Sequence, residues 1–423
     1  MNNTNSRLLA ALALKKVTES GGYSNLVLNS VFKENPISPE DKALATAIFY
    51  GTLDHMVTID FYLKKLIKTP LKKLKPLTLS VLRSAVYQIK YMSKVPESAA
   101  VNEAVKIIKA SSESFNASFV NGVLRNVIRT EIPLPTGNSI YDISVAYSCP
   151  DWVVSVLLAD YGVEFTKSFL ENALATPPTF ARVNTNKISA EELTGLLETE
   201  NVSAKILSKT ALLLNLSGTV ENLNSYKQGL FFLQDLSCQK AIEMLNIGEN
   251  DSVLDLCAAP GGKSFNAALT ANKGRVVSCE LYPHRADLIE KGALRLSIKN
   301  IETNVADATV FSSELGLFDK IICDVPCSGL GVIRRKPDIK YKKQNSFKEL
   351  TEIQFKILEN ATNYLKKGGK ILYSTCTLNK LENFENVSAF LKAHPEFSLV
   401  SEQTFSCNTD NCDGFYAAVI QKN

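Results

Sequence analysis

The stretch VLDLCAAPGGKS, residues 253–264, has the form of a buried strand, a loop of small residues and the start of a helix. Asp255 stands where the strand ends, and Gly261 and Gly262 precede the helical stretch. Three more apolar strands follow, separated by helical stretches: RVVSCEL, DKIICDV and GKILYST. Because strand and helix alternate, we predict a doubly wound parallel sheet, an α/β Rossmann-like domain, over residues 231–423.

The loop over residues 257–263 is the first candidate binding site. In doubly wound sheets, ligands bind where strands end and loops begin. Glycines let a backbone come close to a ligand, and a helix start offers free amide donors. The run fits neither the three spaced glycines of dinucleotide sites nor the spacing of a phosphate loop. A nucleotide phosphate is therefore not the expected ligand.

Two acidic residues follow the next two strands. Glu280 ends the strand RVVSCE, where a carboxylate can accept hydrogen bonds from both hydroxyls of a ribose. Asp307, in NVADAT, stands at another strand end, where it could meet an adenine amino group. Each acid alone is more simply explained as part of a surface turn. Together with the glycine loop they favour an adenosine cofactor without phosphate, which fits S-adenosyl-L-methionine.

Two cysteines follow adjacent strands near the expected cofactor. Asp324 and Cys327 come after DKIIC, and Cys376 comes after GKILYST. A thiolate added to carbon 6 of a cytosine would activate carbon 5 toward a methyl donor, which is covalent catalysis. A second group must then help remove the carbon-5 proton, and an acid placed like Asp324 could hold the ring's amino group and ring nitrogen. The residues alone do not rank the two thiols.

Simpler explanations apply to other cysteines. Cysteine is often a small buried apolar residue, and we interpret four of them as packing residues: Cys238, Cys257, Cys279 and Cys323. A zinc site is not expected, because the chain has three scattered histidines and no Cys-x-x-Cys pair. Serine-hydrolase chemistry is excluded, since no histidine accompanies a Gly-x-Ser-x-Gly elbow.

Composition indicates a folded protein of several domains. The 423 residues are 45% apolar and 21% charged. Nine cysteines at irregular spacing, without an export signal, predict reduced thiols and a cytoplasmic location. The apolar run 8–14 is interpreted as part of an amphipathic helix rather than a signal peptide. No run of about 18 uncharged apolar residues occurs, so no membrane span is expected.

Three domains are predicted. Residues 1–135 show the three- and four-residue apolar spacing of helices, and residues 1–145 carry 18 Lys and Arg against 11 Asp and Glu. A basic helical domain attracts polyanions, although a lysine-rich face is often only solvated surface. The run EIPLPTGNSI is the best linker. Residues 140–230 are interpreted as a small α+β module for RNA recognition or linkage, and 231–423 as the catalytic domain.

Three motifs resemble one known family: LDLCAAPGGKS, CDVPCSGLGVIRRKPDIKY and YSTCTL. They are similar to those of RNA (cytosine-5)-methyltransferases, specifically the bacterial RsmB or Sun-type members that modify small-subunit ribosomal RNA. Two further stretches also resemble this family: FLQDLSCQ, at the start of the expected catalytic domain, and DGFYAAVI, near its end. Three helical stretches resemble the NusB antitermination factor, an all-helical RNA-binding domain: DKALATAIFYGTLDH, VPESAAVNEAVKI and FVNGVLRNVIR. The resemblance covers nearly the whole chain.

This resemblance implies a role for each site residue. Cys376 would be the nucleophile, and Cys327 would assist release of the methylated product. Asp324 would lie beside the target base. The cofactor-binding positions would be Cys257, Ala258, Ala259, Pro260, Gly261, Gly262, Lys263, Glu280, Asp307 and Asp324. The substrate would be a cytosine of 16S rRNA, single-stranded or turned out of its stack. We expect a monomer that uses S-adenosyl-L-methionine and no metal.

Some residues depart from the family pattern. Val325 stands where alanine is usual, and Tyr341 where tryptophan is common. After Cys376, NKLENFE replaces the usual Pro-Glu-Glu-Asn run, although Asn383 keeps the expected distance. This change leaves the support of the nucleophile loop in question. The cations of RRKPDIKY either meet RNA phosphates or belong to a solvated loop.

Two rival functions stay open at this point. One is a non-catalytic RNA-binding or antitermination protein that has inherited the methyltransferase fold. The pair Cys327 and Cys376 argues against it, because a scaffold has no need of two thiols at strand ends. The other is a DNA cytosine methyltransferase, in which the Pro-Cys thiol would be the nucleophile. The cysteine that forms the covalent adduct would distinguish these alternatives.

Overall fold

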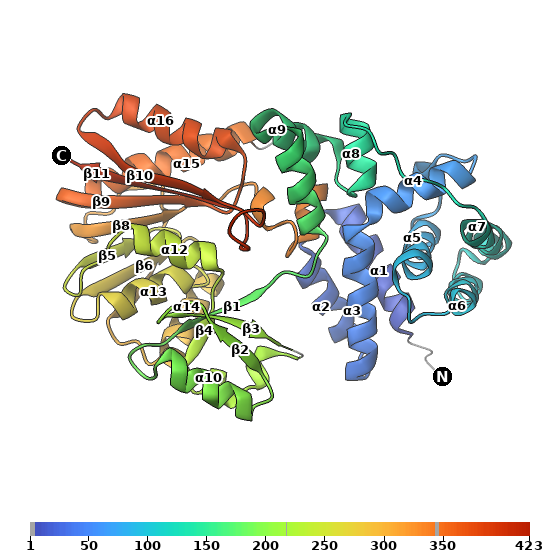
Figure 1. Cartoon of the computed structure of the whole chain (residues 1–423), viewed down its shortest axis with the longest axis horizontal. Coiled ribbons are helices and arrows are strands. Elements are labelled where there is room, and N and C mark those ends of the chain that lie inside the picture. Colours follow the sequence, from blue (N-terminus) through green and yellow to red (C-terminus); the bar gives the residue numbers. More distant parts are fainter. Residues whose placement is uncertain (1–4, 217, 343–346) are drawn as a thin grey trace. The chain divides into compact units, whose positions relative to one another are not determined.

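A computed structural model of the protein describes residues 5–216, 218–342 and 347–423. The chain forms two compact units (Figure 1). The helical unit comprises Met1–Ala175 and Ile333–Lys343, and the sheet unit comprises Thr176–Val332 and Gln344–Asn423. The predicted three-part architecture, helical, small α+β and Rossmann-like, is confirmed as a fold class. The boundaries near residues 135–140 and 230 remain a prediction.

Nine α-helices form the first part of the helical unit in the described chain. They are α1 (Ser6–Ser20), α2 (Ser24–Glu34), α3 (Pro39–Asp54), α4 (Met56–Leu66), α5 (Pro76–Tyr91), α6 (Glu97–Lys109), α7 (Ala117–Arg129), α8 (Ile140–Ala146) and α9 (Asp151–Ala173). Ser38 caps α3 by accepting a hydrogen bond from the amide of Asp41, and Pro39 occupies the first turn. The apolar stripes of these helices pack together into the core of the unit.

No single described helix combines the length and the apolar composition of a membrane span, and one sharply bent pair, α8 with α9, meets the two criteria only together.

A short segment far along the sequence completes the helical unit. Residues 333–342, which we call the strap, contain a 3₁₀ turn at Pro337–Tyr341. The Lys340 side chain is only 3% exposed, and its Nζ donates to the carbonyls of Asp54 and Ser148 at 3.0 and 3.2 Å. The Tyr341 hydroxyl donates to the Leu53 carbonyl at 2.7 Å. The strap therefore packs with segments that precede it by 192 to 288 residues.

A small antiparallel sheet begins the sheet unit. Its strands are β1 (Thr179–Val183), β2 (Ser203–Ile206), β3 (Ala211–Asn215) and β4 (Phe231–Leu233), in the order β2-β3-β1-β4. Helix α10 (Ala190–Thr199) begins with a capping box between Ser189 and Glu192, and the short α11 (Asn224–Lys227) precedes β4. The stretches TFARVNT and ALLLNLSG contain β1 and β3.

The main sheet has seven strands in the order β10-β11-β9-β8-β5-β6-β7. They are β5 (Ser252–Asp255), β6 (Arg275–Glu280), β7 (Ile301–Val305), β8 (Phe318–Asp324), β9 (Leu365–Thr375), β10 (Phe397–Phe405) and β11 (Phe415–Lys422). Strands β5 to β9 pair in parallel, as predicted, whereas β11 and β10 add an antiparallel edge. The connecting helices are α12 (Leu236–Met244), α13 (Gly262–Thr270), α14 (Pro283–Leu296), α15 (Phe347–Ala361) and α16 (Phe384–Ala393).

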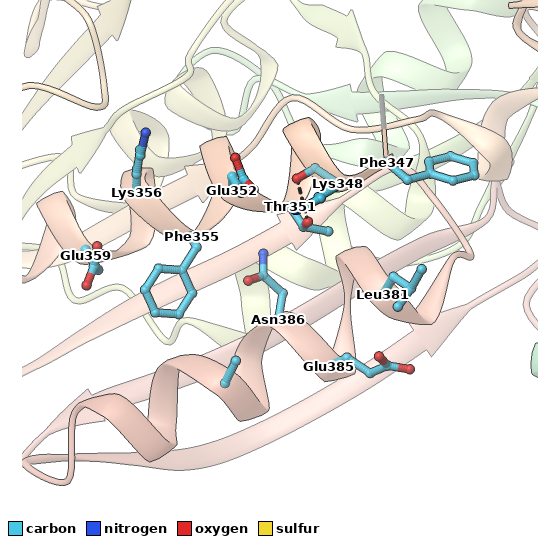
Figure 2. A pocket seen from close by; sticks show the side chains of 11 residues that line it. Phe347, Lys348, Thr351, Glu352, Phe355, Lys356, Glu359, Leu381, Glu385 and Asn386 are labelled. Carbon is cyan, nitrogen blue, oxygen red and sulfur yellow. Dashed lines mark hydrogen bonds between the residues drawn. The ribbon is translucent and has the colours of Figure 1, made fainter. Parts of the chain in front are cut away.

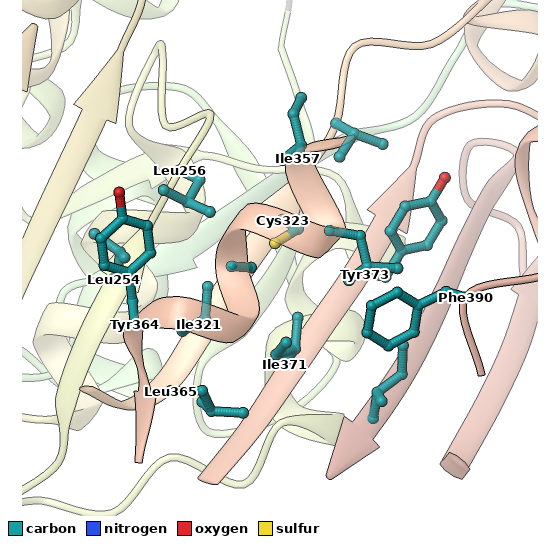
Figure 3. Close-up of a cluster of buried hydrophobic side chains, with 14 of the residues drawn as sticks. Leu254, Leu256, Ile321, Cys323, Ile357, Tyr364, Leu365, Ile371, Tyr373 and Phe390 are labelled. Carbon is teal, nitrogen blue, oxygen red and sulfur yellow. The ribbon is translucent and has the colours of Figure 1, made fainter. Parts of the chain in front are cut away.

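The central strands β5, β6, β8, β9 and β11 are largely buried on both faces, which explains the apolar runs within them. Leu254, Ile321 and Ile371 belong to the cluster that packs with α15 and α16, and Figure 3 shows this cluster, which also contains Tyr373 and Phe390. The alternate residues of the same strands, including Val253, Ile322 and Leu372, pack in the cluster with α12 and α13. The loops after the strands are thereby held on a rigid platform.

Candidate active site

The loop after β5 forms a small pocket. Gly261 has φ +108°, and a Cβ there would lie 2.3 Å from the ring of Phe265, so the tight turn requires glycine. A cavity of about 190 Å³ lies beside this turn. Its lining includes seven of the predicted cofactor-binding residues: Cys257, Ala258, Ala259, Pro260, Gly262, Lys263 and Asp324. The structure thus brings the loop after β5 and the end of β8 to one pocket.

Glu280 and Asp307 lie at the ends of β6 and β7 and do not line this cavity. The Glu280 carboxyl group is 4% exposed, lies 3.2 Å from the guanidinium of Arg285 and accepts a hydrogen bond from the amide of Tyr282. Asp307 is exposed, and its carboxyl group accepts hydrogen bonds from the amide and hydroxyl of Thr309. Their roles toward a cofactor remain predictions.

Two further polar residues line the pocket. Both belong to the stretch FLQDLSCQ, which the sequence analysis had quoted only for its resemblance to the family. Gln234 and Asp235 both line the pocket, just after β4. The Gln234 amide nitrogen donates to the Gly262 carbonyl at 3.0 Å. Asp235 caps α12 through the amide of Ser237. The Gln-Asp pair in FLQDLSCQ was the signal for both, although sequence alone did not assign them to the pocket.

Asp324 connects this pocket with the next loop. Its carboxyl group lies 2.7 Å from the ammonium group of Lys263 and accepts a hydrogen bond from the Ser374 hydroxyl at 2.9 Å. Burial disfavours the charged form of Lys263, but the neighbouring negative charges, Asp324 first among them, raise its pKa above the usual value. Ser374, at the end of β9, was not identified from the sequence.

The two cysteines expected to react lie together. The Sγ atoms of Cys327 and Cys376 are 3.3 Å apart, in the loops that follow the adjacent parallel strands β8 and β9. The neighbouring hydroxyls of Ser328 and Thr377 form a hydrogen bond of 2.7 Å. The hydrogen bond to the Cys376 sulfur, together with burial, raises the pKa of Cys327 well above its usual value. Either sulfur can be the hydrogen-bond donor in this contact.

The run after Cys376 supports these loops despite its departure from the family pattern. Glu382 accepts hydrogen bonds from the Ser328 amide at 2.8 Å and from the Asn379 side chain at 3.0 Å. Asn383 accepts a hydrogen bond from the Thr375 hydroxyl and donates to the Thr377 carbonyl. Glu382 was missed in the sequence analysis, where only Asn383 was noted.

The cysteines that we interpreted as packing residues lie in or beside the cores. Cys279 and Cys323 are fully buried, and burial raises the pKa of Cys279 to about 12. Cys238 lines the pocket, with its sulfur 3.6 Å from the Lys263 ammonium group. Over the part of the chain that the structure describes, no three His, Cys, Asp or Glu side chains gather as metal ligands would.

A wider groove of about 730 Å³ lies between α15 and α16, lined by residues such as Thr351, Phe355 and Leu381 (Figure 2). None of the predicted site residues lines it.

The two lysines of RRKPDIKY differ in their exposure to solvent. Lys340 is buried in the helical unit, so it does not meet phosphates, whereas Lys336 is exposed.

Comparison with known proteins assigns most of the chain. Residues 242–420 match the family model "16S rRNA methyltransferase RsmB/F", residues 4–129 the NusB family, and residues 149–221 the RsmF/B-like ferredoxin-like domain. The probable ribosomal RNA small subunit methyltransferase B of Bacillus subtilis is 39% identical over 94% of this chain and 90% of its own length. Ribosomal RNA small subunit methyltransferase B of Proteus mirabilis is 31% identical, with 99% of both chains covered.

Solved structures share the fold. The crystal structure of PH0851 covers 99% of both chains with a TM-score of 0.82 at 23% identity. NSun6 from Pyrococcus horikoshii with SFG covers 64% of this chain and 98% of its own, with a TM-score of 0.58 at 20% identity. Given the sequence relatives and the thiol pair beside the pocket, the chain belongs to the family of ribosomal RNA small subunit methyltransferase B, with S-adenosyl-L-methionine as cofactor.

Proposed function

We propose that this protein methylates carbon 5 of a specific cytosine in 16S ribosomal RNA through a covalent bond between Cys376 and the base. One observation carries the proposal: the Sγ atoms of Cys327 and Cys376 are 3.3 Å apart, and Asp324 borders the pocket before them. The family match to 16S rRNA methyltransferases supports the RNA substrate.

The pocket suits S-adenosyl-L-methionine better than a phosphate-bearing nucleotide. Three carboxyl groups, those of Asp235, Asp255 and Asp324, line it, and its one ammonium group, on Lys263, is paired with Asp324. Such a lining disfavours an anionic phosphate and tolerates a cation. When bound, S-adenosyl-L-methionine supplies a methyl group on a positively charged sulfur. We infer that the residues 257–263 hold it, with Glu280 at the ribose and Asp307 near the adenine.

The chemistry requires a nucleophile because carbon 5 of cytosine is too electron-poor to accept a methyl group unaided. In our proposal the Cys376 sulfur bonds to carbon 6, and the electron pair of the 5,6 double bond moves to carbon 5. Carbon 5 then forms its bond to the methyl group as the bond between that methyl group and the donor sulfur breaks, and the sulfur keeps the electron pair. Asp324 holds the ring's amino group and ring nitrogen while negative charge develops on the ring.

Release reverses the first bond. The carbon-5 proton leaves, its electron pair restores the double bond, and the Cys376 thiolate departs from carbon 6. We assign the assistance of this step to Cys327. Once Cys327 has given up its own proton to solvent, its thiolate can accept the carbon-5 proton, because its sulfur lies 3.3 Å from that of Cys376. The two thiols therefore have different tasks, attack for Cys376 and release for Cys327.

The target base must leave its stack to reach these thiols. A cytosine in a duplex is inaccessible, so we infer a single-stranded or flipped-out base. Residues 1–135 are proposed to bind RNA, because their matching family is NusB and the basic excess of the chain lies there. Residues 140–230 are proposed to help recognise RNA, and the protein is proposed to act as a cytoplasmic monomer.

The test follows the fate of the two cysteines. Full-length protein is incubated with S-adenosyl-L-methionine and 16S rRNA lacking the modification, and 5-methylcytosine is mapped by bisulfite sequencing. We expect Cys376→Ala to abolish methylation and adduct formation, whereas Cys327→Ala accumulates a protein–RNA adduct that survives denaturation. Cys149→Ala, a buried cysteine of the helical unit, is the matched control. Normal methylation by Cys376→Ala would refute the assignment.

The same experiment separates the rivals. A DNA-type enzyme would form its adduct through Cys327, so Cys376→Ala would still be trapped on the nucleic acid. A non-catalytic RNA-binding protein would bind the rRNA in every variant and methylate it in none, the wild type included.

A further inference from the structure

The carboxyl group of Glu382 joins the two loops that carry the reactive thiols. Glu382 ends the 3₁₀ turn Lys380–Glu382 and is fully buried. Its Oε2 accepts a hydrogen bond from the Ser328 amide at 2.8 Å, and its Oε1 accepts one from Nδ2 of Asn379 at 3.0 Å. Ser328 follows Cys327 directly, and Asn379 lies on the Cys376 loop. One carboxyl group thus contacts both loops.

Gln354 on α15 extends this contact to the other side of Cys327. Its Nε2 donates to Oε2 of Glu382 at 3.0 Å and to the Pro326 carbonyl at 2.9 Å. The backbone is therefore fixed on both sides of Cys327, at the Pro326 carbonyl and at the Ser328 amide. The Tyr373 hydroxyl in turn donates to the Glu382 backbone carbonyl at 2.6 Å.

The placement of this carboxyl group is costly unless its partners are present. Burial of a carboxyl group is unfavourable without hydrogen bonds, and a buried network with all its partners is rigid. Both carboxyl oxygens have partners, and their donors come from the Cys327 loop, the Cys376 loop and α15. A side chain that served only to cap its own helix would not reach three segments.

We infer that Glu382 is a positioning residue that holds the Cys327 loop against the Cys376 loop, so that both thiols reach the same base. The inference deepens the proposed function and rests on it for its catalytic meaning. It also answers how the nucleophile loop keeps its support although the run after Cys376 departs from the family pattern.

Thiol proximity can be measured without RNA or methyl transfer. Phenylarsine oxide binds two neighbouring thiols at once, forming two As–S bonds while its oxygen leaves as water with the two thiol protons. We expect the full-length wild type to bind it. Cys327→Ala and Cys376→Ala each lack one thiol of the pair, so any phenylarsine oxide that they still bind is held elsewhere in the protein. Glu382→Ala should weaken the affinity of phenylarsine oxide for this thiol pair by about tenfold or more, because several hydrogen bonds to the carboxyl group are lost.

Two further variants make the comparison sharp. Glu382→Gln keeps the shape of the side chain and one acceptor oxygen, so it should restore most of the arsenical affinity. Glu385→Ala removes an exposed carboxyl group three residues further along and should bind like the wild type. If Glu382→Ala does not fold, Gln354→Leu serves in its place. It removes the two hydrogen bonds that Gln354 Nε2 donates, while Glu382 keeps the hydrogen bond from the Ser328 amide.

The second readout is the partition of the reaction. With rRNA and S-adenosyl-L-methionine, Glu382→Ala should shift protein toward the trapped adduct, as Cys327→Ala does, because the Cys376 attack persists while release fails. Wild-type arsenical affinity in both Glu382→Ala and Gln354→Leu would overturn the positioning role. Failure of the proposed function would look different: neither the wild type nor Cys327→Ala would form an adduct through Cys376, while the arsenical affinities would still follow Glu382.

Discussion

The ammonium group of Lys263 lies 2.7 Å from the carboxyl group of Asp324 and 5.0 Å from the ring centre of Phe415. Lys263 belongs to the first turn of α13, and Asp324 ends β8. This ion pair joins the pocket at the loop after β5 to the end of β8, which leads into the Cys327 loop. Lys263 lies on α13, Asp324 on β8 and Phe415 on β11, so the site depends on the whole central part of the sheet.

Replacement of Lys263 by methionine should disable the site without unfolding the protein. The Asp324 carboxyl group would lose its cationic partner in a partly buried place, and hydrogen bonds to charged groups contribute about 1.5–3 kcal/mol. We therefore expect single-turnover methylation to fall by about tenfold to a hundredfold. Lys263→Arg should retain part of the activity.

The control for this experiment is Lys273→Ala. Lys273 also pairs with a carboxyl group, that of Glu249 at 3.0 Å, but both side chains are more than half exposed. Exposed pairs contribute little, so methylation by this variant should equal the wild type. A Lys263→Met enzyme with undiminished turnover would show that Asp324 needs no cation.

Gly331 is a second vulnerable position. Its amide donates to the Cys376 carbonyl at 3.0 Å, its carbonyl accepts from the Gly414 amide, and an added Cβ would lie 1.9 Å from the Gly414 oxygen. Gly331→Ala must displace one of these backbones, so we expect a loss of about 1–3 kcal/mol in stability and slower methylation. Gly195→Ala, where a Cβ meets nothing within 4 Å, should be neutral or stabilising. Equal melting temperatures for the two variants would contradict the expectation.

The strap should respond to the loss of Lys340. Lys340→Ala leaves the carbonyls of Asp54 and Ser148 without their donor in a buried place, which should destabilise the helical unit by about 2–4 kcal/mol. The single tryptophan of the chain, Trp152, donates its indole N–H to the Lys340 carbonyl at 3.2 Å and therefore reports on the strap. Denaturant unfolding followed by its fluorescence measures the change.

The exposed Lys336, four residues earlier in the strap, is the control for Lys340. Lys336→Ala should unfold at the wild-type denaturant concentration. If Lys340→Ala does so as well, the buried ammonium group has no part in holding the strap.

The helical unit should also lose stability as the pH rises from about 4 to about 6. Burial raises the pKa of Asp54 to about 6 from 3.8, and the Lys340 ammonium group offsets this only in part. Between these values the folded state holds a proton that the unfolded state has released, so protonation favours folding and deprotonation removes that contribution. The change is on the order of 2 kcal/mol.

Denaturant unfolding followed by Trp152 fluorescence at several pH values tests this expectation. Asp54→Asn should flatten the dependence between pH 4 and 6, whereas Glu40→Gln, at an exposed carboxyl group of α3, should leave its slope unchanged. A slope that persists in Asp54→Asn would assign the effect to another group.

Local sequence patterns were enough to predict the elements of the sheet. The strands ending at Asp255, Glu280 and Asp324 are apolar because both faces of the sheet are buried, so their positions follow from short-range patterns. Glu382 could not be found in this way. Its partners Ser328 and Gln354 are 54 and 28 residues away in the sequence, and no local spacing encodes such pairs.

The order of motifs along the chain determined by itself that thiols, an acid and a glycine loop would follow parallel strands, because strand ends of one sheet share an edge. Only the tertiary structure decided that Cys327 and Cys376 touch, that Glu382 holds their loops, and that residues 333–342 pack among helices of the first part of the chain. The physical reason is the same in each case. Contacts between distant segments depend on how buried polar groups such as Lys340 and Glu382 find their partners after the elements have packed, and a linear pattern carries no record of that choice.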